Sequence, residues 1–412
     1  MSDMNHTYLH DLREGLEQKL RERLDEVIDT IVRTKEKGGK IVVVTGSGPN
    51  IHEGVTTLLA ELVSRGVVDG IVTSSAVVAH EMAGSLDRVK RVDGRSIGID
   101  AELLPRGDLF EVTLLDEESI ALIREEMSVD TALMDRVLDM PGDTIIKAAG
   151  NMAYPMGLRT ERLAVEVQSL AQCCGETFEY IAGLGADAKT MIGAGARKRV
   201  PVVVSVPQLI GGGMVGLCIG DSISFKQRST LIATMLSGAS VIIESGIALS
   251  QEIHDGPFET YTGHGIWSAW GGHGTFSLKD KVLVRIDLDP NLEKVWEVEK
   301  LDGEVQRSVD QGLPKTKTFK VPFRMEMSGF ARLEGSIPLI GDLGVIWPLI
   351  AEEVSDRLKL NLGFISYPQE NENGKEMRNW SEENVGIVDR HQMIRQARSL
   401  MSWFGPMREE GV

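Results

Sequence analysis

The fold of this chain is decided by the stretch KIVVVTGSGPNIHEGVTTLLAELVSRG, residues 40–66. Residues 40–45 are dominated by β-branched apolar side chains, which is typical of a strand buried on both faces of a parallel sheet. A glycine-rich turn follows, and apolar residues at helical spacing then predict a helix over 54–66. Strand, small-residue turn and helix in this order form the repeating unit of an α/β sheet.

The same alternation continues along the chain. It predicts further strands at 67–75, 200–206, 239–245 and 281–288, and helices at 76–86, in a pair across 158–198, and near 223–237. Residues 340–358 read as the end of a late strand and its helix, while 87–150 hold polar inserts without a clear pattern. About six strands interleaved with helices predict an α/β fold with a doubly wound parallel sheet of the Rossmann type.

The pattern divides the chain into three parts. Residues 1–38 hold an amphipathic helix, 39–360 form the α/β domain with an insert at 302–335, and 361–412 are a polar C-terminal extension with one isolated helix. Over 8–36, leucine and isoleucine recur at spacings of three and four, so we expect one helix with a charged outer face. Such a helix packs on a core or on a partner subunit.

Composition narrows the classes of function. Among 412 residues, 42% are apolar, which is enough for a large core, and 44 glycines against 14 prolines suit tight turns between strands and helices. A net charge of −17 argues against a nucleic-acid partner. It agrees with a small cationic substrate such as an amine, although an acidic surface also simply keeps proteins soluble. Three cysteines make no disulfide framework, and no apolar signal core or 18-residue apolar span occurs, so we expect a cytoplasmic protein without a membrane partner.

Four small-residue turns follow predicted strands: GSGPNIHEG (46–54), TSSA (73–76), PQLIGGGMVG (207–216) and ESGIALSQE (244–252). Parallel sheets bind ligands at the carboxyl ends of their strands, where such turns let backbone N–H groups approach a phosphate. The first turn is not GxGxxG, because position 51 is isoleucine, and plain connections or helix caps would also explain each turn. Together the turns predict cofactor contacts at Gly46, Ser47, Gly48, Thr73, Ser74, Ser75, Gly212, Gly213, Glu244, Ser245 and Gly246.

Acids and histidines add candidate chemistry near these turns. Asp287 ends the strand in RIDLDP (285–290), where an acid can accept hydrogen bonds from ribose hydroxyls; alternatively, Asp289-Pro290 starts a turn and caps the next helix. His52, Glu53 and His80 lie just after strands and are candidates for general acid or base, with structural hydrogen bonding as the alternative for the histidines.

The remaining histidines lie further along the chain. The loop GHGIWSAWGGHG (263–274), with His264 and His273, reads as a lid or substrate wall, and His254 precedes it. No histidine pair has HxxxH or HExxH spacing, so we expect no metal site.

Residues 40–86 resemble the NAD-binding core of deoxyhypusine synthases, which also run strand, small-residue turn, "LV..G.VD.IVT" and helix. More closely, they resemble the archaeal-type ornithine cyclodeaminases, which also form the C-terminal half of bifunctional arginine dihydrolases. There His52 and Gly54 match a "VH-G" turn, His80 an "AVH" helix, and GRSIGID (94–100) a "G-SLGVD" segment. Further on, three more segments have counterparts in these families: RKRVPVVVSVPQ, ASVIIESGIALSQEI and KVLVRIDLDPNLEKV. Finally, GDLGVIWPLIAEE (341–353) is similar to a segment of deoxyhypusine synthases whose aspartate, here Asp342, contacts NAD.

The chain departs from both families at functional positions. Where deoxyhypusine synthases carry acids in "TDGSLGD", this chain has IGGGMVG with Gly211 and Gly216. Their nucleophilic lysine in "SWGK" has no match, because Trp270-Gly271 is followed by Gly272. Without that lysine the covalent imine of deoxyhypusine synthesis cannot form. The histidine-rich segment of ornithine cyclodeaminases is replaced by AELLPRGDLF, so ornithine is not assured as the substrate.

The resemblance implies NAD as cofactor, a homotetramer or homodimer, and transient hydride transfer on a small amine or amino-acid substrate. This would be an oxidoreductase-type step within a lyase or transferase reaction. Two alternatives stay open at this point: a non-redox enzyme that binds another nucleotide or phosphorylated ligand in the same crevice, and a regulatory protein without chemistry.

Overall fold

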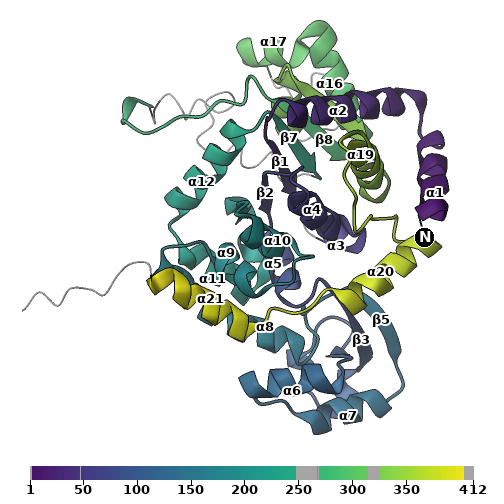
Figure 1. Ribbon diagram of the computed structural model, residues 1–412, viewed down its shortest axis with the longest axis vertical. Helices are drawn as coiled ribbons and strands as arrows, with labels where there is room; N and C mark the ends of the chain where they lie inside the picture. The colour runs from purple at the N-terminus through teal and green to yellow at the C-terminus, as the bar shows by residue number, and fades with distance from the viewer. Residues whose placement is uncertain (1, 47, 247–266, 268, 314–324, 403–412) are drawn as a thin grey trace, which may run out of the picture.

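The centre of the molecule is a six-stranded parallel sheet. The structure, a computed structural model, describes residues 2–46, 48–246, 267, 269–313 and 325–402 (Figure 1). The strands are β1 (Ile41–Thr45), β2 (Gly70–Thr73), β6 (Val202–Val204), β7 (Val241–Ser245), β8 (Val282–Asp287) and β9 (Ser336–Ile340).

The strand order is β6-β2-β1-β7-β8-β9, and every neighbouring pair is parallel. Numbered by position in the chain, these strands run 3-2-1-4-5-6, the order of dinucleotide-binding Rossmann folds. From β1 the chain first builds outward through β2 to β6, and then returns to the other side of β1 to lay down β7. The order therefore reverses between β1 and β7.

Helices cover both faces of this sheet because its strands are buried on both faces. Along β1, Ile41 and Val43 join one apolar cluster, whereas Val42 and Val44 join another. The first cluster includes α2 (Gln18–Glu36), α4 (Val55–Ser64), α9 (Phe178–Gly185), α10 (Met191–Lys198) and α19 (Leu343–Arg357). The second includes α12 (Phe225–Gly238), α16 (Pro290–Asp302) and α18 (Met325–Arg332). The prediction of a doubly wound parallel sheet is confirmed.

The N-terminal region forms two helices, so the prediction of one helix over 8–36 is wrong. Helix α1 (Ser2–Glu14) ends before Gly15, and α2 begins at Gln18. Glycine is a poor interior residue for a helix, and here it lies at the break. The apolar face of α2 packs within its own chain through Leu24, Val27, Ile28, Ile31 and Val32. This helix therefore gives no support to the predicted homo-oligomer, which stays a prediction.

A second, smaller sheet lies inside the region read as polar inserts. Strand β3 (Leu86–Asp93) pairs antiparallel with β4 (Leu109–Thr113) and with β5 (Asp143–Ala148). The layer around this small sheet is completed by two helices and two short 3₁₀ turns: α6 (Glu117–Glu126), α7 (Thr131–Asp139), η1 (Gly94–Ile97) and η2 (Ala101–Leu103). Figure 1 shows this layer at the end of the molecule away from α16 and α17 (Glu304–Asp310). Its strands are only partly buried, so they carry charged residues that mask the strand pattern.

The remaining helices connect these layers. The region 158–198 holds three helices rather than a pair: α8 (Met156–Cys174), α9 and α10. Several short helices follow the carboxyl ends of strands or the loops beyond them. They are α3 (Gly48–His52), α5 (Ser75–Met82), α11 (Met214–Ser222), η3 (Val206–Gln208) and η4 (Ile210–Gly212). The C-terminal region adds α20 (Glu372–Asn384), which contacts β3 and β5, and α21 (Arg390–Ser402), which contacts α8 and α9. No helix in the described ranges has the length and apolarity needed to cross a membrane.

A buried ion pair joins the edge strand β6 to the helices around it. Arg228 of α12 and Glu179 of α9 are both fully buried and paired. Glu179 also accepts a hydrogen bond from the Val204 N–H at 2.7 Å, and Arg228 donates to the Ile219 carbonyl at 3.0 Å. Each charge is thus neutralised by its partner and by the backbone, and the loss of either would leave the other buried without compensation.

We therefore expect Arg228→Met to lower the free energy of unfolding by about 3–5 kcal/mol, because Glu179 would remain buried and unpaired. Urea denaturation followed by circular dichroism measures this. Lys226→Met is the matched control, because it removes one exposed positive charge from the same helix and should change stability by less than about 0.5 kcal/mol. Equal effects of the two substitutions would contradict the role of the buried pair.

Candidate functional site

Three buried hydroxyls at the carboxyl edge of the sheet have no hydrogen-bond partner among the described residues. They belong to Thr45 at the end of β1, Thr73 at the end of β2 and Ser205 just after β6, and each residue is at most 1% exposed. Because Val44 pairs with Val72, Thr45 and Thr73 lie side by side in the sheet. A buried hydroxyl without a partner is unfavourable, so this edge offers unused hydrogen-bonding capacity where such sheets bind ligands.

The turns after β1 and β7 expose their backbone to open space. A Cβ atom added at Gly48 would meet no atom of the described residues within 4 Å, and the same holds for Gly246, whose φ is +97°. These glycines flank the reversal in strand order, and their lack of a side chain lets a ligand approach the main chain closely. Gly46 directly follows β1, and Ser47 lies outside the described residues.

Ser245 organises this reversal point from within. Its hydroxyl donates to Asn50 Oδ1 at 2.6 Å and accepts a hydrogen bond from Trp347 Nε1 at 2.9 Å. Its carbonyl also accepts from the Gly46 N–H at 3.3 Å. The Ser245 hydroxyl is thus engaged both as donor and as acceptor, and it holds the turn after β1 against β7 and α19.

The acids of β7 and β8 are engaged with Arg285, which is fully buried. Glu244 Oε2 lies 3.5 Å and Asp287 Oδ2 3.2 Å from Arg285 Nε, and Asp287 Oδ1 accepts from the Asp289 N–H at 3.0 Å. The ribose contact of Asp287 therefore stays a prediction. Asp289 caps α16, as the alternative interpretation of Asp289-Pro290 expected, and exposed Asp342 caps α19.

The turn after β2 is used largely for packing. The Ser74 hydroxyl caps α5, and the Ser75 hydroxyl donates to the Gln208 carbonyl at 2.8 Å and accepts from the Gly212 N–H at 2.9 Å. A Cβ at Gly212 would lie 2.7 Å from the Ser75 carbonyl oxygen, so this glycine permits close contact between the two loops. Gly213 has a φ of +59°, which also favours glycine. The glycine run thus has a structural reason independent of any cofactor.

His80 is held in one tautomer by the small sheet. Its Nδ1 lies 2.6 Å from the Ala149 carbonyl oxygen, so Nδ1 carries the proton and Nε2 is left as an acceptor. Burial lowers the pKa of His80; the hydrogen bond to Ala149 opposes this effect, and the charge of Lys147 adds to it. The imidazole is therefore neutral near pH 7, as a general base must be. Beside it is a cavity of about 170 Å³, lined among others by Gly150, Asn151 and Glu161.

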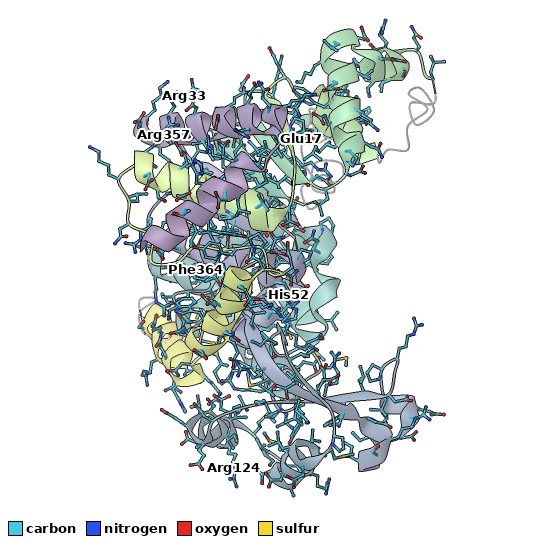
Figure 2. The ribbon with its side chains drawn as sticks, turned by 90° about the vertical axis from the view of Figure 1, so that its right-hand side faces the viewer. Glu17, Arg33, His52, Arg124, Arg357 and Phe364 are labelled. Atoms are coloured by element: carbon cyan, nitrogen blue, oxygen red, sulfur yellow. The ribbon has the colours of Figure 1, made fainter. Side chains whose placement is uncertain are left out.

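His52 lies near His80. Burial lowers the pKa of His52, and the charges of Arg378, His80 and Lys147 lower it further. Figure 2 shows His52 at the junction between the parallel-sheet body and the small sheet. The structure thus brings together two of the predicted catalytic residues, from the helices that follow β1 and β2.

Glu53 has a different environment. It is buried, and Gln369 donates to both of its carboxylate oxygens, from the backbone N–H at 2.8 Å and from Nε2 at 2.9 Å. Burial is the main cause that raises the pKa of Glu53. This carboxylate anchors the C-terminal region to the turn after β1, which accounts for its burial without a catalytic role.

Several charged residues of the site were missed from the sequence. Lys147 of β5 pairs with Glu111 of β4 at 2.6 Å, and Asp87 of β3 accepts from the Gly150 N–H at 3.1 Å. Arg378 comes from α20. These residues are far apart in the sequence and belong to no motif, so only the packing of the small sheet and the C-terminal helix onto the body reveals them.

Residues 263–266 and 268 of the predicted lid lie outside the described residues, as do His254 and His264. Trp267 and Trp270 are exposed, with ring centroids 6.1 Å apart. Within the described ranges, no three side chains of His, Cys, Asp or Glu are grouped so that they could hold a metal ion.

Comparison with known proteins gives matches among solved structures only; no family model and no curated protein matches the chain. A protein described as LOR/SDH from Methanococcus maripaludis S2 is similar with 12% identity over 84% of this chain and 70% of that one, at a TM-score of 0.39. AgrE, in its ternary complex with ornithine and NAD+, has 13% identity over 83% of this chain and a TM-score of 0.40. A protein described as a deoxyhypusine synthase from Entamoeba histolytica has 11% identity over 85% of this chain and 98% of that one, at a TM-score of 0.38.

ArgZ, a cyanobacterial arginine dihydrolase, and the deoxyhypusine synthase are of the kinds that the sequence resemblance names. The chain spans 34% of the length of AgrE and 32% of that of ArgZ. All of these likenesses are distant.

A pH-dependent stability follows from Asp87. Burial raises its pKa to about 6, and the hydrogen bonds that Oδ2 accepts from the Gly150 N–H and the Thr113 hydroxyl offset this effect only in part. The pKa of Asp87 is higher in the folded chain, about 6, than the ordinary value of 3.8 expected in the unfolded chain. The protonated carboxyl group therefore stabilises the fold fully below pH 3.8, and this contribution is lost as the pH rises to about 6. We expect Asp87→Asn to raise the free energy of unfolding at pH 8 by roughly 1–3 kcal/mol, and to have little effect at pH 4. Chemical denaturation at both pH values measures this.

Asp143→Asn, at an exposed aspartate on the neighbouring strand β5, is the control and should be neutral at both pH values. Destabilisation by Asp87→Asn at pH 8 would show that the charged form of Asp87 is the one that the fold prefers.

Proposed function

We propose that this protein binds NAD at the carboxyl edge of the parallel sheet, where β1 and β7 part, and acts on a small amine or amino acid by hydride transfer. The observation that carries the proposal is the strand order β6-β2-β1-β7-β8-β9 with its reversal at that point. In open parallel sheets of this order, dinucleotides bind across the crevice formed where the order reverses.

The residues at this edge fit a dinucleotide. The unpartnered hydroxyls of Thr45 and Thr73 can donate to phosphate oxygens. The open backbone at Gly48 and Gly246 allows the close approach that a pyrophosphate needs. Asp287, at the end of the next strand, is the proposed ribose contact, and Asp342, at the end of the last strand, is a second contact with the cofactor.

His80 is the proposed general base. A bound nicotinamide ring would supply the acceptor for a hydride. His80 Nε2 would take the proton that leaves the substrate amine or hydroxyl as its neighbouring C–H bond loses that hydride. The Ala149 carbonyl keeps Nε2 unprotonated and oriented, and burial keeps the imidazole neutral. His52 is the second acid–base candidate, because burial and nearby positive charges lower its pKa and favour the neutral imidazole.

Thr73→Val tests the cofactor site. Valine has nearly the same shape, and the substitution removes a hydroxyl that has no partner among the described residues, so it should not lower the melting temperature. If Thr73 donates to a cofactor phosphate, the affinity for NAD should fall about ten- to a hundredfold, the effect of one charge-assisted hydrogen bond. Isothermal titration calorimetry with NAD measures this.

Thr230→Val, at an exposed position on α12, is the control and should bind NAD like the wild type. Absence of NAD binding by the wild type would contradict the proposal as a whole. Binding of another nucleotide in its place would favour the non-redox alternative.

His80→Asn tests the general base. The asparagine amide can still donate to the Ala149 carbonyl from the position of Nδ1, but it offers no equivalent of Nε2. Turnover of amines or amino acids with NAD, followed by the absorbance of the reduced cofactor, should fall by about 10²–10⁴-fold. The melting temperature should change little.

His391→Asn, at an exposed histidine on α21, should keep the wild-type rate. A stable His80→Asn protein with full turnover would remove His80 from the mechanism.

A further inference from the structure

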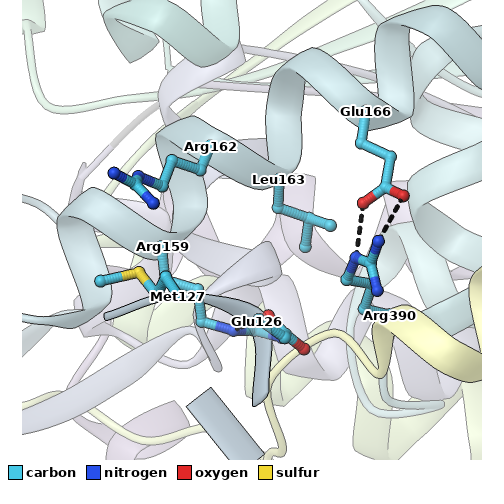
Figure 3. Close-up of a pocket in the computed structure, with 7 residues that line it drawn as sticks. All are labelled: Glu126, Met127, Arg159, Arg162, Leu163, Glu166 and Arg390. Atoms are coloured by element: carbon cyan, nitrogen blue, oxygen red, sulfur yellow. Dashed lines mark hydrogen bonds and ion pairs between the residues drawn. The ribbon is translucent and has the colours of Figure 1, made fainter. Parts of the chain in front are cut away.

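A second cavity, of about 320 Å³, lies where α6, α8 and α21 meet (Figure 3). Three arginines and two glutamates dominate its lining, which is made by Glu126, Met127, Arg159, Arg162, Leu163, Glu166 and Arg390. The lining therefore carries one net positive charge in a chain whose net charge is −17. None of these residues belongs to the carboxyl edge of the sheet or to the cavity beside His80.

The two glutamates are already neutralised. Arg159 donates to both oxygens of Glu126, from Nε at 2.7 Å and from Nη2 at 2.9 Å. Arg390 donates in the same way to Glu166, at 2.6 and 2.8 Å, and Figure 3 shows this pair at one side of the cavity. Paired carboxylates of this kind leave little negative charge to repel an anion.

Positive groups remain without a partner. Arg159 is only 1% exposed, and its Nη1 atom has no acceptor among the described residues. A buried guanidinium N–H without an acceptor is costly, so the site favours a ligand that supplies one. Arg162 lines the other side of the cavity, and Figure 3 draws no hydrogen bond or ion pair between its guanidinium and the other lining residues.

We propose that this cavity binds a small oxyanion, a phosphate or carboxylate group held between Arg159 and Arg162. Guanidinium groups match the planar, divergent oxygens of such anions and bind them with two hydrogen bonds. The volume exceeds that of several water molecules, each of which occupies about 30 Å³ in the liquid, so a phosphate or small dicarboxylate fits.

The position of the site links three parts of the molecule. Glu126 belongs to α6 of the small-sheet layer and Arg390 to the C-terminal α21, while α8 lies between them. The opposite side of α8 contributes Gly157, Thr160 and Glu161 to the cavity beside His80. One helix thus separates the oxyanion site from the proposed active site, so the two sites are distinct.

Calorimetric titration of the full-length protein with inorganic phosphate, and separately with succinate, tests the site. We expect one equivalent of at least one of these anions to bind. Arg162→Gln should weaken that binding at least about tenfold, as expected for the loss of a charge-assisted hydrogen bond. Arg162 is exposed and pairs with none of the residues that line the cavity, so the variant should fold normally, which its melting temperature will show.

Arg124→Gln is the matched control. It removes the same charge from exposed α6, close to Glu126 in sequence but outside the cavity lining, and should leave the affinity within about twofold, since surface charges act weakly through solvent. Preference for phosphate or for succinate would identify the anion class. The proposal is overturned if neither anion binds at millimolar concentration, or if both variants weaken binding equally. It is also overturned if an anion binds and Arg162→Gln has no effect on its affinity, because the anion then occupies another site, such as the nucleotide crevice.

Discussion

The constraint on which this structure depends is the burial of the central parallel sheet on both faces. Backbone amides and carbonyls of such a sheet are paired from strand to strand, so its side chains must be covered by helices above and below. Along β1, alternate residues enter two different apolar clusters, one against α2, α4 and α19 and the other against α12, α16 and α18. Because all strands run the same way, their carboxyl ends and the turns that follow them gather at a single edge.

That edge is completed by segments far away in the sequence. The Ala149 carbonyl from the small sheet orients His80, and Gln369 from the C-terminal region holds Glu53. Trp347 of α19 donates to Ser245, which in turn holds the turn after β1. The small-sheet layer and the C-terminal region thus position side chains that the Rossmann-type body carries.

The buried polar residues contribute in two ways. Arg228 and Glu179 pair with each other and with backbone groups, and so join α12, α9 and β6. Thr45 and Thr73 keep a hydroxyl without a partner in the described structure, and Arg159, although paired with Glu126, keeps Nη1 without one. Unpartnered buried polar groups are rare in folded proteins, which is why these positions are the basis of the two proposed binding sites.

The sequence by itself determined the type of fold and the identity of the main strands, because long β-branched runs followed by glycine-rich turns and helical periodicity leave a strong local signal. It also indicated His52 and His80, which follow successive strands and do come close together. It failed at 87–150, where half-exposed strands carry charges, and at Gly15, which divides the N-terminal helix. Only the tertiary structure decided which hydroxyls remain without a partner, which histidine nitrogen is free, and that Arg159, Arg162 and Arg390 line one cavity. These properties depend on contacts between residues far apart in the chain, and such contacts leave no periodic or local signal in the sequence.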